Sequence, residues 1–190
     1  PGIIMAISRD KRLIVSTATT ALQDQLFQKD IPRALAALAE AGLIDVRVAV
    51  AKGRERHVCP MRLDAVVTQG DLFAVEDARR AQLEAIAQTW TGGDWNGLVD
   101  TLPTRPARSI WLEVANTSAS CTGDGCSHRQ SCPYYAALDE AAQARVIVTN
   151  HDYLLTSLAN DTSSVVCDSE NNLYAFDEAH HLQDKVLAAF

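Results

Sequence analysis

The sequence predicts an α/β fold in which a parallel sheet is interrupted by an inserted module, and three observations support this prediction. Short runs are apolar on consecutive positions, as expected of strands that are covered on both faces. These runs alternate with helical segments near both ends of the chain, as in a parallel sheet with crossover helices. Between residues 52 and 143 the alternation disappears. We therefore expect a scaffold built from residues 1–51 and 144–190, with a mostly helical insertion at 52–143.

The first part of the scaffold has the pattern strand, helix, helix, strand. Residues 12–17 are an apolar run that ends in small hydroxyl side chains, which predicts a strand. A helical pattern of leucines follows over residues 20–41. Pro32 lacks an N–H and disfavours helix in the residue before it, so we expect two helices that meet there. Gly42 is a helix stop, and residues 45–50 predict a second strand.

Two stretches of the insertion differ in composition. Residues 74–88 have the composition of a helix, whereas residues 90–106 are rich in Gly, Trp and Pro and predict an irregular connection. From residue 133 the alternation resumes, with expected helices at 133–143 and 152–158 and expected strands at 145–149 and 173–176. These two later strands complete the expected parallel sheet.

The composition excludes several classes of protein. With 190 residues, of which 47% are hydrophobic, the chain can bury a sizeable core. It opens at Pro1 with no signal peptide and no apolar run near the ~18 residues of a membrane span, so we expect an excised piece of a longer soluble protein without membrane contact. Five cysteines indicate metal ligation in a reducing compartment, the cytoplasm, rather than a disulfide framework. The net charge of -7 excludes a uniformly basic nucleic-acid surface, so any DNA contact must be local.

An acidic pair follows the last predicted strand. The carboxylates of Asp177 and Glu178 would emerge at its C-terminal end, where open α/β sheets bind ligands. In P-loop nucleotide hydrolases, an aspartate at this place holds Mg²⁺ and an adjacent glutamate orients or deprotonates the attacking water. Asp177 is therefore the metal candidate and Glu178 the base candidate. The alternative is a solvated strand end or the cap of a helix, because acidic residues are common after strands.

Three cysteines are closely spaced and a fourth lies far upstream. The close group has the spacing C-x4-C-x5-C, with glycines that let the backbone curl around an inorganic centre. Structural zinc ligands are usually separated by about two to four residues, so the five-residue gap favours an iron-sulfur cluster held by four thiolates. The candidate ligands are Cys59, Cys121, Cys126 and Cys132.

Three other residues offer metal-ligand atoms. His57 and His128 could replace a cysteine, although histidines beside such motifs more often lie outside the ligand set. Cys167 has no cysteine nearby, so we expect a buried or incidental thiol there.

The strongest basic cluster surrounds Cys59. It could face DNA phosphates or form an ordinary solvated loop, and the sequence leaves both interpretations open. Ser16 and Thr17, at the end of the first strand, could likewise bond to DNA phosphates or cap the next helix. The candidate DNA-binding residues are Ser16, Thr17, Lys52, Arg54 and Arg56, with Arg62 nearby.

Together these segments resemble the first motor domain of the DinG-type helicases, bacterial members of the superfamily 2 group that includes XPD. The resemblance spans essentially the whole chain, and its most specific part is the four-cysteine spacing combined with the DEAH tetrapeptide. It rests on Pro1-Gly2-Ile3, Val15-Ser16-Thr17-Ala18, Ala21-Leu22-Gln23-Asp24-Gln25, Lys52-Gly53-Arg54, Val58-Cys59-Pro60, Trp95-Asn96-Gly97-Leu98, the three close cysteines, Val148-Thr149-Asn150-His151 and Asp177-Glu178-Ala179-His180-His181-Leu182.

The resemblance implies a RecA-like domain of an ATP-dependent DNA helicase that moves 5′ to 3′ on single-stranded DNA and uses Mg²⁺ with ATP. Asp177, Glu178 and His180 become the candidate catalytic residues. It also implies a [4Fe-4S] cluster on the four candidate cysteines, in a module that depends on the Fe–S bonds because it is too small for a stable core of its own. Implied substrates are forked duplexes, D-loops and R-loops in repair and replication. Implied too are a monomer, single-stranded-DNA-binding protein as a partner, and a place at the nucleoid.

In this interpretation the chain is incomplete as an enzyme. The glycine-rich phosphate loop and its lysine would precede Pro1, and the second motor domain would follow Phe190. We therefore expect the isolated piece to bind nucleotide poorly and not to unwind DNA. Two other functions stay open: a zinc-stabilised DNA-binding module without catalysis, and a redox or cluster-carrier domain.

Overall fold

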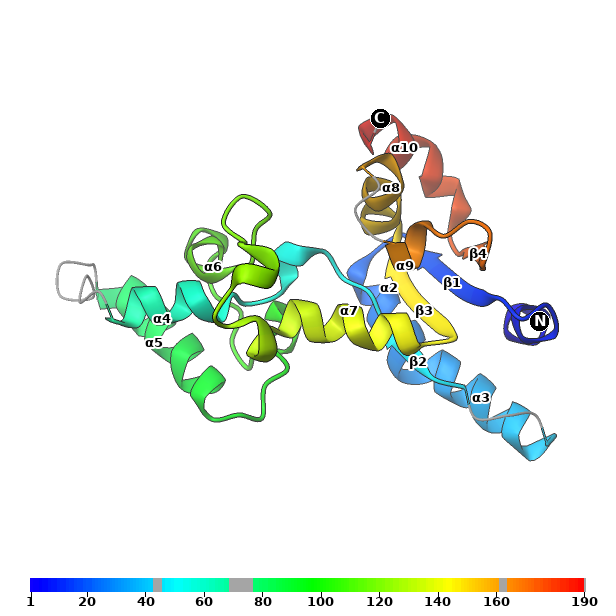
Figure 1. Ribbon diagram of the computed structural model, residues 1–190, viewed down its shortest axis with the longest axis horizontal. Coiled ribbons are helices and arrows are strands. Elements are labelled where there is room, and N and C mark those ends of the chain that lie inside the picture. The colour runs from blue at the N-terminus through cyan, green and yellow to red at the C-terminus, as the bar shows by residue number, and fades with distance from the viewer. Residues whose placement is uncertain (43–45, 69–76, 161–163, 190) are drawn as a thin grey trace. The chain divides into compact units, whose positions relative to one another are not determined.

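The chain forms two compact units in the computed structural model, which describes residues 1–42, 46–68, 77–160 and 164–189 (Figure 1). Unit 1 comprises Pro1–Lys52 and Ala137–Phe190, and unit 2 comprises Gly53–Ala136. Each unit has a hydrophobic core. Unit 2 is thus inserted in the sequence of unit 1. The predicted division at 51/52 and 143/144, with an iron-sulfur module between, stays a prediction.

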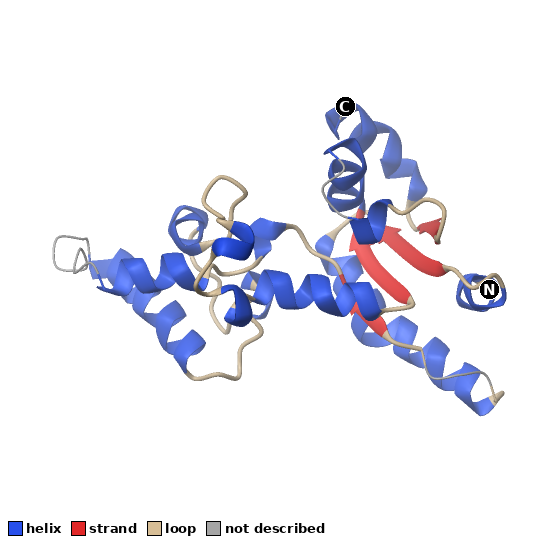
Figure 2. Cartoon of the chain, viewed as in Figure 1, coloured by secondary structure: helices blue, strands red, loops and turns tan. Residues whose placement is uncertain are grey.

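Unit 1 is built on a four-stranded parallel sheet (Figure 2). Its strands are β1 Arg12–Thr17, β2 Val48–Val50, β3 Val146–Asn150 and β4 Asn172–Phe176, in the order β2-β3-β1-β4. Every ladder is parallel. The predicted α/β class with a parallel sheet is therefore confirmed.

Apolar side chains cover both faces of this sheet. Leu13 packs in one core cluster and its neighbour Ile14 in the other, and Ile147 is likewise separated from Val146 and Val148. Successive side chains on a strand point to opposite faces, so this division shows that both faces are buried. Burial on both faces is the reason why these strands are uninterrupted apolar runs in the sequence.

Helices flank the strands of unit 1. They are α1 Gly2–Ser8, α2 Thr20–Gln25, α3 Ile31–Glu40, the part of α7 Pro133–Gln143 from residue 137 onward, α8 His151–Asn160, α9 Ser164–Cys167 and α10 Leu182–Ala189. α8 and α10 lie side by side, and the ion pair of Lys185 Nζ with Asp152 Oδ2 at 2.7 Å joins them (Figure 1). The helices expected at 133–143 and 152–158 are present.

The helical region around Pro32 differs from the predicted break. A five-residue π-helix, Leu26–Asp30, joins α2 to α3. In an α-helix a proline ring clashes with the carbonyl four residues before it, and the wider π turn relieves that clash. Gly42 ends the region as predicted, with φ of +75° and its N–H donating to the Ala39 carbonyl at 3.0 Å. Residue 45, the expected start of the second strand, lies outside the described residues, and β2 begins at Val48.

Unit 2 is mainly helical. Its helices are α4 Pro60–Thr68, α5 Asp77–Thr91, α6 Arg108–Val114 and the first turn of α7. α5 corresponds to the helix expected at 74–88, of which residues 74–76 lie outside the described part of the chain. α4 is a helix that the sequence analysis missed, although Pro60 at its first position is a helix-start signal.

Unit 2 has an apolar core of its own, and the expectation that the insertion is too small to be stable through such a core stays a prediction. Trp95 and Trp111 both belong to this core, with ring centroids 6.4 Å apart in an edge-to-face arrangement. Aromatic side chains bury a large area each, so a few of them suffice to build a core in a short segment. The buried members are Val58, Leu63, Leu83, Ile86, Trp95, Val99, Ile110, Trp111, Val114 and Ala115.

The connection after α5 is irregular, as predicted, with one short 3-10 turn at Val99–Thr101. Gly97 has φ of +78°, and its carbonyl accepts a hydrogen bond from the Val58 N–H at 2.8 Å. A Cβ at this position would lie 2.5 Å from Pro133. Gly97 is therefore required both by its backbone conformation and by close packing.

Candidate functional site

The DEAH tetrapeptide begins where β4 ends. The N–H of Asp177 donates to the Ser16 carbonyl at 2.8 Å, next to the β1–β4 ladder. The Thr17 hydroxyl donates to Asp177 Oδ2 at 3.3 Å. Two residues of β1 therefore hold the backbone and the exposed carboxylate of Asp177 at the carboxyl edge of the sheet, where open α/β sheets bind ligands.

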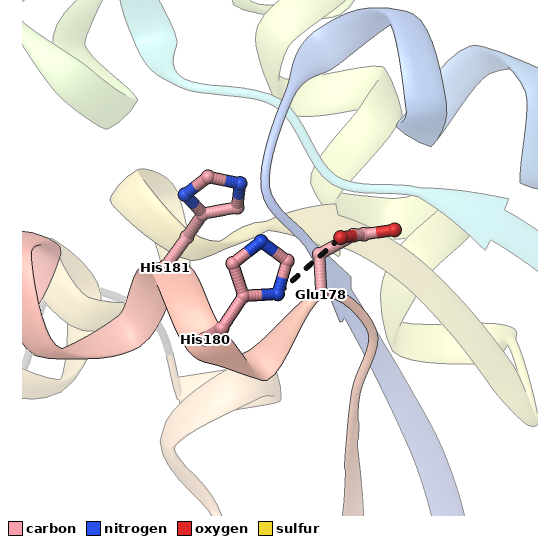
Figure 3. Close-up of side chains that lie close together, drawn as sticks. All are labelled: Glu178, His180 and His181. Atoms are coloured by element: carbon pink, nitrogen blue, oxygen red, sulfur yellow. Dashed lines mark ion pairs between the residues drawn. The ribbon is translucent and has the colours of Figure 1, made fainter.

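The chain turns sharply at Glu178. Its φ of 52° lies in the left-handed region, which costs a non-glycine residue about 1–2 kcal/mol. A 3-10 turn, Ala179–His181, then leads into α10. Glu178 Oε2 lies 3.5 Å from Nδ1 of His180, and both side chains are exposed (Figure 3). Backbone strain of this kind is concentrated at functional sites, where it fixes the direction of a side chain.

His151, the first residue of α8, joins the ends of two strands. Its Nδ1 lies 2.7 Å from the Ser16 hydroxyl, and its ring centroid lies 6.0 Å from that of Phe176. The side chain is fully buried, and burial lowers the pKa of His151. Among the described residues its Nε2 has no hydrogen-bond partner. The sequence analysis named His151 only within a resembling segment, although its position directly after a strand is a signal for the sheet edge.

Ser16 and Thr17 lie buried beneath this edge of the sheet. Both side chains are fully buried, and their hydroxyls contact His151 and Asp177. Their alternative role as a helix cap is wrong, because Thr19 caps α2 by accepting the Leu22 N–H at 3.2 Å. The predicted contact of Ser16 and Thr17 with DNA stays a prediction.

Lys52 is also buried in unit 1. Its Nζ lies 2.6 Å from Asp24 Oδ1, and only 4% of the residue is exposed. The neighbouring Gln23 donates from Nε2 to the carbonyls of Ala51 and Val148 at 2.8 and 3.1 Å. The segment 23–24 therefore ties α2 to the chain that leaves β2. A DNA contact by Lys52 stays a prediction.

The four candidate cysteines line a single pocket in unit 2, although Cys59 is remote from the others in sequence. The Cys59 N–H donates to the Val114 carbonyl at 2.7 Å, and its carbonyl accepts the Leu63 N–H in the first turn of α4. The remaining three lie on a segment that contains only the 3-10 turns Gly123–Gly125 and Arg129–Ser131. A helix start and an irregular loop thus bring the four thiols together.

The spacing of the sulfur atoms differs from that of a closed zinc site. Within the described residues, the only three metal-type donor atoms that lie within 4.8 Å of one another belong to other residues. No three of these thiols are therefore that close. A tetrahedral zinc ion with Zn–S bonds of ~2.3 Å would require sulfur atoms about 3.8 Å apart. A multi-iron centre held by four thiolates separates its ligands more widely. Four thiols on one pocket are a ligand set that iron-sulfur clusters use, and the [4Fe-4S] cluster stays a prediction.

Polar side chains surround two of the thiols. Asn116 Nδ2 donates toward Cys132 Sγ at 3.7 Å, and the Tyr135 hydroxyl lies 3.7 Å from Cys121 Sγ. Although burial opposes it, hydrogen bonds from the Gly123 backbone and the Tyr135 hydroxyl lower the pKa of the Cys121 thiol. These hydrogen bonds favour the thiolate, which is the form of cysteine that binds metals.

Cys59 differs in this respect, because burial raises the pKa of its thiol. Asn116 and Tyr135 were not identified from the sequence. Tyr135 follows Cys132 closely, which was an available signal, whereas Asn116 carries none.

The other sulfur and imidazole candidates lie apart or have other partners. His57 is buried, packs edge-to-face on Tyr134 at 5.5 Å and does not line the pocket. His128 does line it, with Nε2 2.8 Å from Asp64 Oδ2. Cys167 packs partly buried against a core of the sheet in unit 1, in agreement with the expectation for that thiol.

The arginines near Cys59 make contacts inside unit 2. Arg54 lies over the Tyr134 ring, 4.1 Å from its centroid, and Arg56 pairs with Asp100. Arg62 donates to the Ala115 carbonyl at 2.7 Å. These contacts give the arginines structural roles, and their predicted role in DNA binding stays a prediction.

No helix within the described residues has the length and apolar character that crossing a membrane requires.

Known proteins of similar sequence indicate a family. The DEAD_2 family model matches residues 119–189, from the cysteine loop to the DEAH box and α10. ATP-dependent DNA helicase DinG of Escherichia coli strain K12 is 34% identical over 97% of the chain. The chain therefore corresponds in sequence to a segment of the DinG-type helicases. Helicases of the same name from Shigella flexneri and Photobacterium profundum are 33% and 31% identical, over 97% and 95% of the chain. The chain spans 26% of the length of each of these relatives.

Proposed function

We propose that this chain is part of the first motor domain of an ATP-dependent DNA helicase. It supplies the DEAH tetrapeptide at the carboxyl edge of the sheet and a [4Fe-4S] module. The observation that carries the proposal is the combination, in one chain, of Asp177 at the carboxyl edge of a parallel sheet with four thiols that line one pocket. Neither a zinc-stabilised binding module nor a cluster carrier needs an acidic pair at the end of a strand. The relatives named as ATP-dependent DNA helicases support the same function.

At the sheet edge, the proposed roles follow from the contacts of each side chain. Asp177, oriented by the Thr17 hydroxyl, would hold Mg²⁺ with ATP, and the ion when bound neutralises charge on the phosphate oxygens. Glu178 is exposed beside it and would orient or deprotonate the attacking water. His180, 3.5 Å from the Glu178 carboxylate, would hold that carboxylate in position.

In unit 2, Cys59, Cys121, Cys126 and Cys132 would hold the [4Fe-4S] cluster. When bound, the cluster supplies four Fe–S bonds, which tie the start of α4 to the cysteine loop. Such bonds stabilise a segment that has little regular structure of its own. Asn116 and Tyr135 would hydrogen-bond to two of the ligand sulfurs.

The DNA-related part of the proposal concerns the whole helicase. We propose 5′ to 3′ movement on single-stranded DNA, with forked duplexes, D-loops or R-loops as substrates in repair and replication. The candidate contacts are Ser16, Thr17, Lys52, Arg54 and Arg56. A monomeric state, single-stranded-DNA-binding protein as a partner and a cytoplasmic place at the nucleoid belong to the same proposal.

Metal analysis of anaerobically prepared protein tests the cluster. We expect iron and acid-labile sulfide in equal amounts, a brown colour, and loss of both in Cys126→Ser. Cys167→Ser is the matched control and should keep the full iron content, because Cys167 lies in unit 1. Colourless protein with stoichiometric zinc would instead support the zinc-stabilised module, and transfer of the cluster to acceptor proteins would support a carrier.

Hydrolysis is tested in the longer helicase that this proposal requires. Glu178→Gln should lower DNA-stimulated ATP turnover by at least about 100-fold, because it removes the base while the fold is kept. The isolated chain should show no turnover. The isolated chain could instead turn over ATP and lose that turnover in Glu178→Gln. This result would contradict the proposal that the phosphate loop lies in another segment of the helicase.

A further inference from the structure

A second group of metal-type ligands lies at the start of α10. A carboxylate oxygen of Glu178 and one ring nitrogen each of His180 and His181 lie within 4.8 Å of one another. Within the described residues this is the only such group of three or more His, Cys, Asp or Glu side chains. All three side chains are exposed, so an ion from solution can reach them.

The local backbone explains why three neighbouring residues converge. In a regular strand or helix, consecutive side chains point in different directions. Here Glu178 has a left-handed conformation, and the 3-10 turn Ala179–His181 follows at once. The rings of His180 and His181 end with their centroids 4.0 Å apart, and the Glu178 carboxylate lies beside His180 (Figure 3).

The donor atoms match a zinc-class ion. Two imidazoles and one carboxylate are a ligand set of zinc sites, which leave a fourth position for water or substrate. At metal-ligand distances of ~2.0–2.2 Å, a tetrahedral site places its donors about 3.4 Å apart. The observed separation of Glu178 Oε2 and His180 Nδ1 is 3.5 Å. The ring nitrogen of the exposed His181 lies within 4.8 Å of both of these donors.

The same set is poorly suited to Mg²⁺. Magnesium prefers oxygen ligands in octahedral geometry and keeps several waters. Imidazole nitrogen favours zinc, copper, nickel or iron. Magnesium would therefore stay with the neighbouring Asp177, and a zinc-class ion would take the Glu178 group.

We propose that Glu178, His180 and His181 form a binding site for a transition-metal ion of the Zn²⁺ class. An ion held there takes up the Glu178 carboxylate, which then no longer orients water, so occupancy inhibits ATP hydrolysis. The binding site stands on its own geometry, whereas the inhibition rests on the proposed function.

Titration with Zn²⁺ alone tests the site, with the cysteines occupied by the cluster. Calorimetry on cluster-loaded protein should show one ion per chain that His181→Ala removes or weakens at least tenfold. His128→Ala is the matched control, because His128 is another exposed histidine beside a carboxylate, Asp64, but has no third ligand atom within reach. Unchanged binding in His181→Ala overturns the proposal, and so does equal loss in His128→Ala.

Co²⁺ spectra separate a failure of this inference from a failure of the proposed function. If the cysteines hold no cluster, they bind Co²⁺ themselves with strong sulfur charge-transfer bands, and these bands persist in His181→Ala. The site at α10 gives only the weak visible bands of nitrogen and oxygen ligands, which that variant should lose. Absence of any bands that respond to His181→Ala overturns the proposal.

Turnover of the longer helicase provides the functional readout. Micromolar Zn²⁺ should lower ATP turnover at saturating Mg²⁺, and His181→Ala should restore at least about tenfold resistance to the ion. Equal inhibition of the parent protein and His181→Ala would refute the inhibitory role. The titration alone would then decide whether the site binds the ion.

Discussion

The sheet edge in unit 1 and the cysteine pocket in unit 2 hold their functional groups in different ways. Asp177 is positioned by a backbone hydrogen bond to Ser16 and a side-chain hydrogen bond from Thr17, and both of these residues lie on β1. Three of the four pocket cysteines instead lie on a loop with two single 3-10 turns. The edge is therefore formed by the strands of the sheet, whereas little regular structure positions the thiols of the loop.

A second contrast lies inside unit 2. The helices α4, α5 and α6 surround a core with Trp95 and Trp111, while the cysteine loop at 117–132 adds no residue to that core. Cys59 is attached to the helical part of unit 2, because its N–H donates to the Val114 carbonyl at the end of α6. Loss of the ligand should therefore release the loop and leave the helices folded.

Removal of the cluster by a chelator is the largest expected effect. Amide hydrogen exchange in residues 117–132 should approach the rate of an unstructured chain, because the backbone N–H groups of this loop donate only short-range turn bonds within it. Exchange in β1 and β4 should not change. Equal loss of protection in the loop and in α5 would show that the helices of unit 2 do not stay folded independently of the loop.

The substitution Trp111→Ala tests that core directly. It removes a buried ring and the hydrogen bond from its Nε1 to the Glu55 carbonyl at 2.7 Å. We expect the free energy of unfolding to fall by about 3–5 kcal/mol, measured by chemical denaturation. The loss should be the same with and without the cluster. Trp90→Ala is the control with a smaller expected loss, since Trp90 is only partly buried against the core.

At the sheet edge, Ser16→Ala should lower stability by about 1–3 kcal/mol, because it leaves the buried His151 Nδ1 without its partner. Denaturation curves measure the change. Ser8→Ala is the control, since the Ser8 hydroxyl bonds within an exposed helix end and its removal should have almost no effect. If Ser16→Ala were as harmless as the control, the buried network at the edge would not stabilise the fold.

His151 predicts a loss of stability in acid. Burial lowers the pKa of His151 in the folded chain, so the unfolded chain binds the proton more tightly. Stability from this group is present above the ordinary histidine pKa of ~6.5 and falls as the pH drops below it toward the folded value. The unfolding free energy measured between pH 7.5 and 5 should show this slope, and His151→Gln should flatten it. An unchanged slope in that variant would assign the effect to other groups.

The smallest expected effect comes from the ion pair of Arg79 with Glu113, which joins α5 to α6. The hydrogen bond from Arg79 lowers the pKa of the Glu113 carboxyl. Both side chains are about one third exposed, so Arg79→Ala should lower the unfolding free energy by only about 0.2–1 kcal/mol. High salt should reduce the difference between the two proteins. A loss as large as that of Trp111→Ala would mean that ion pairs, not apolar packing, hold unit 2 together.

Local patterns in the sequence account for most of the scaffold. The apolar run at 12–17 predicted β1 because burial on both faces leaves no polar alternation, and Gly42 predicted the end of α3 through its left-handed conformation. The π-helix before Pro32 was not predicted, because a proline signals that α-helical hydrogen bonding is interrupted but not which other turn replaces it. α4 was missed because its apolar face is formed mainly by Leu63 and carries little periodic signal.

The sequence by itself determined the chemical groups of this protein and their order: the acidic pair after a strand, the C-x4-C-x5-C spacing and the alternation of strands and helices. These are properties of neighbouring residues, so short-range rules are sufficient to find them. Only the tertiary structure decided that Cys59 joins the other thiols, that Ser16 and Thr17 support His151 and Asp177, and that a tryptophan core fills unit 2. Those contacts join residues remote along the chain, and strand register and helix packing, which no local pattern encodes, determine which of them meet.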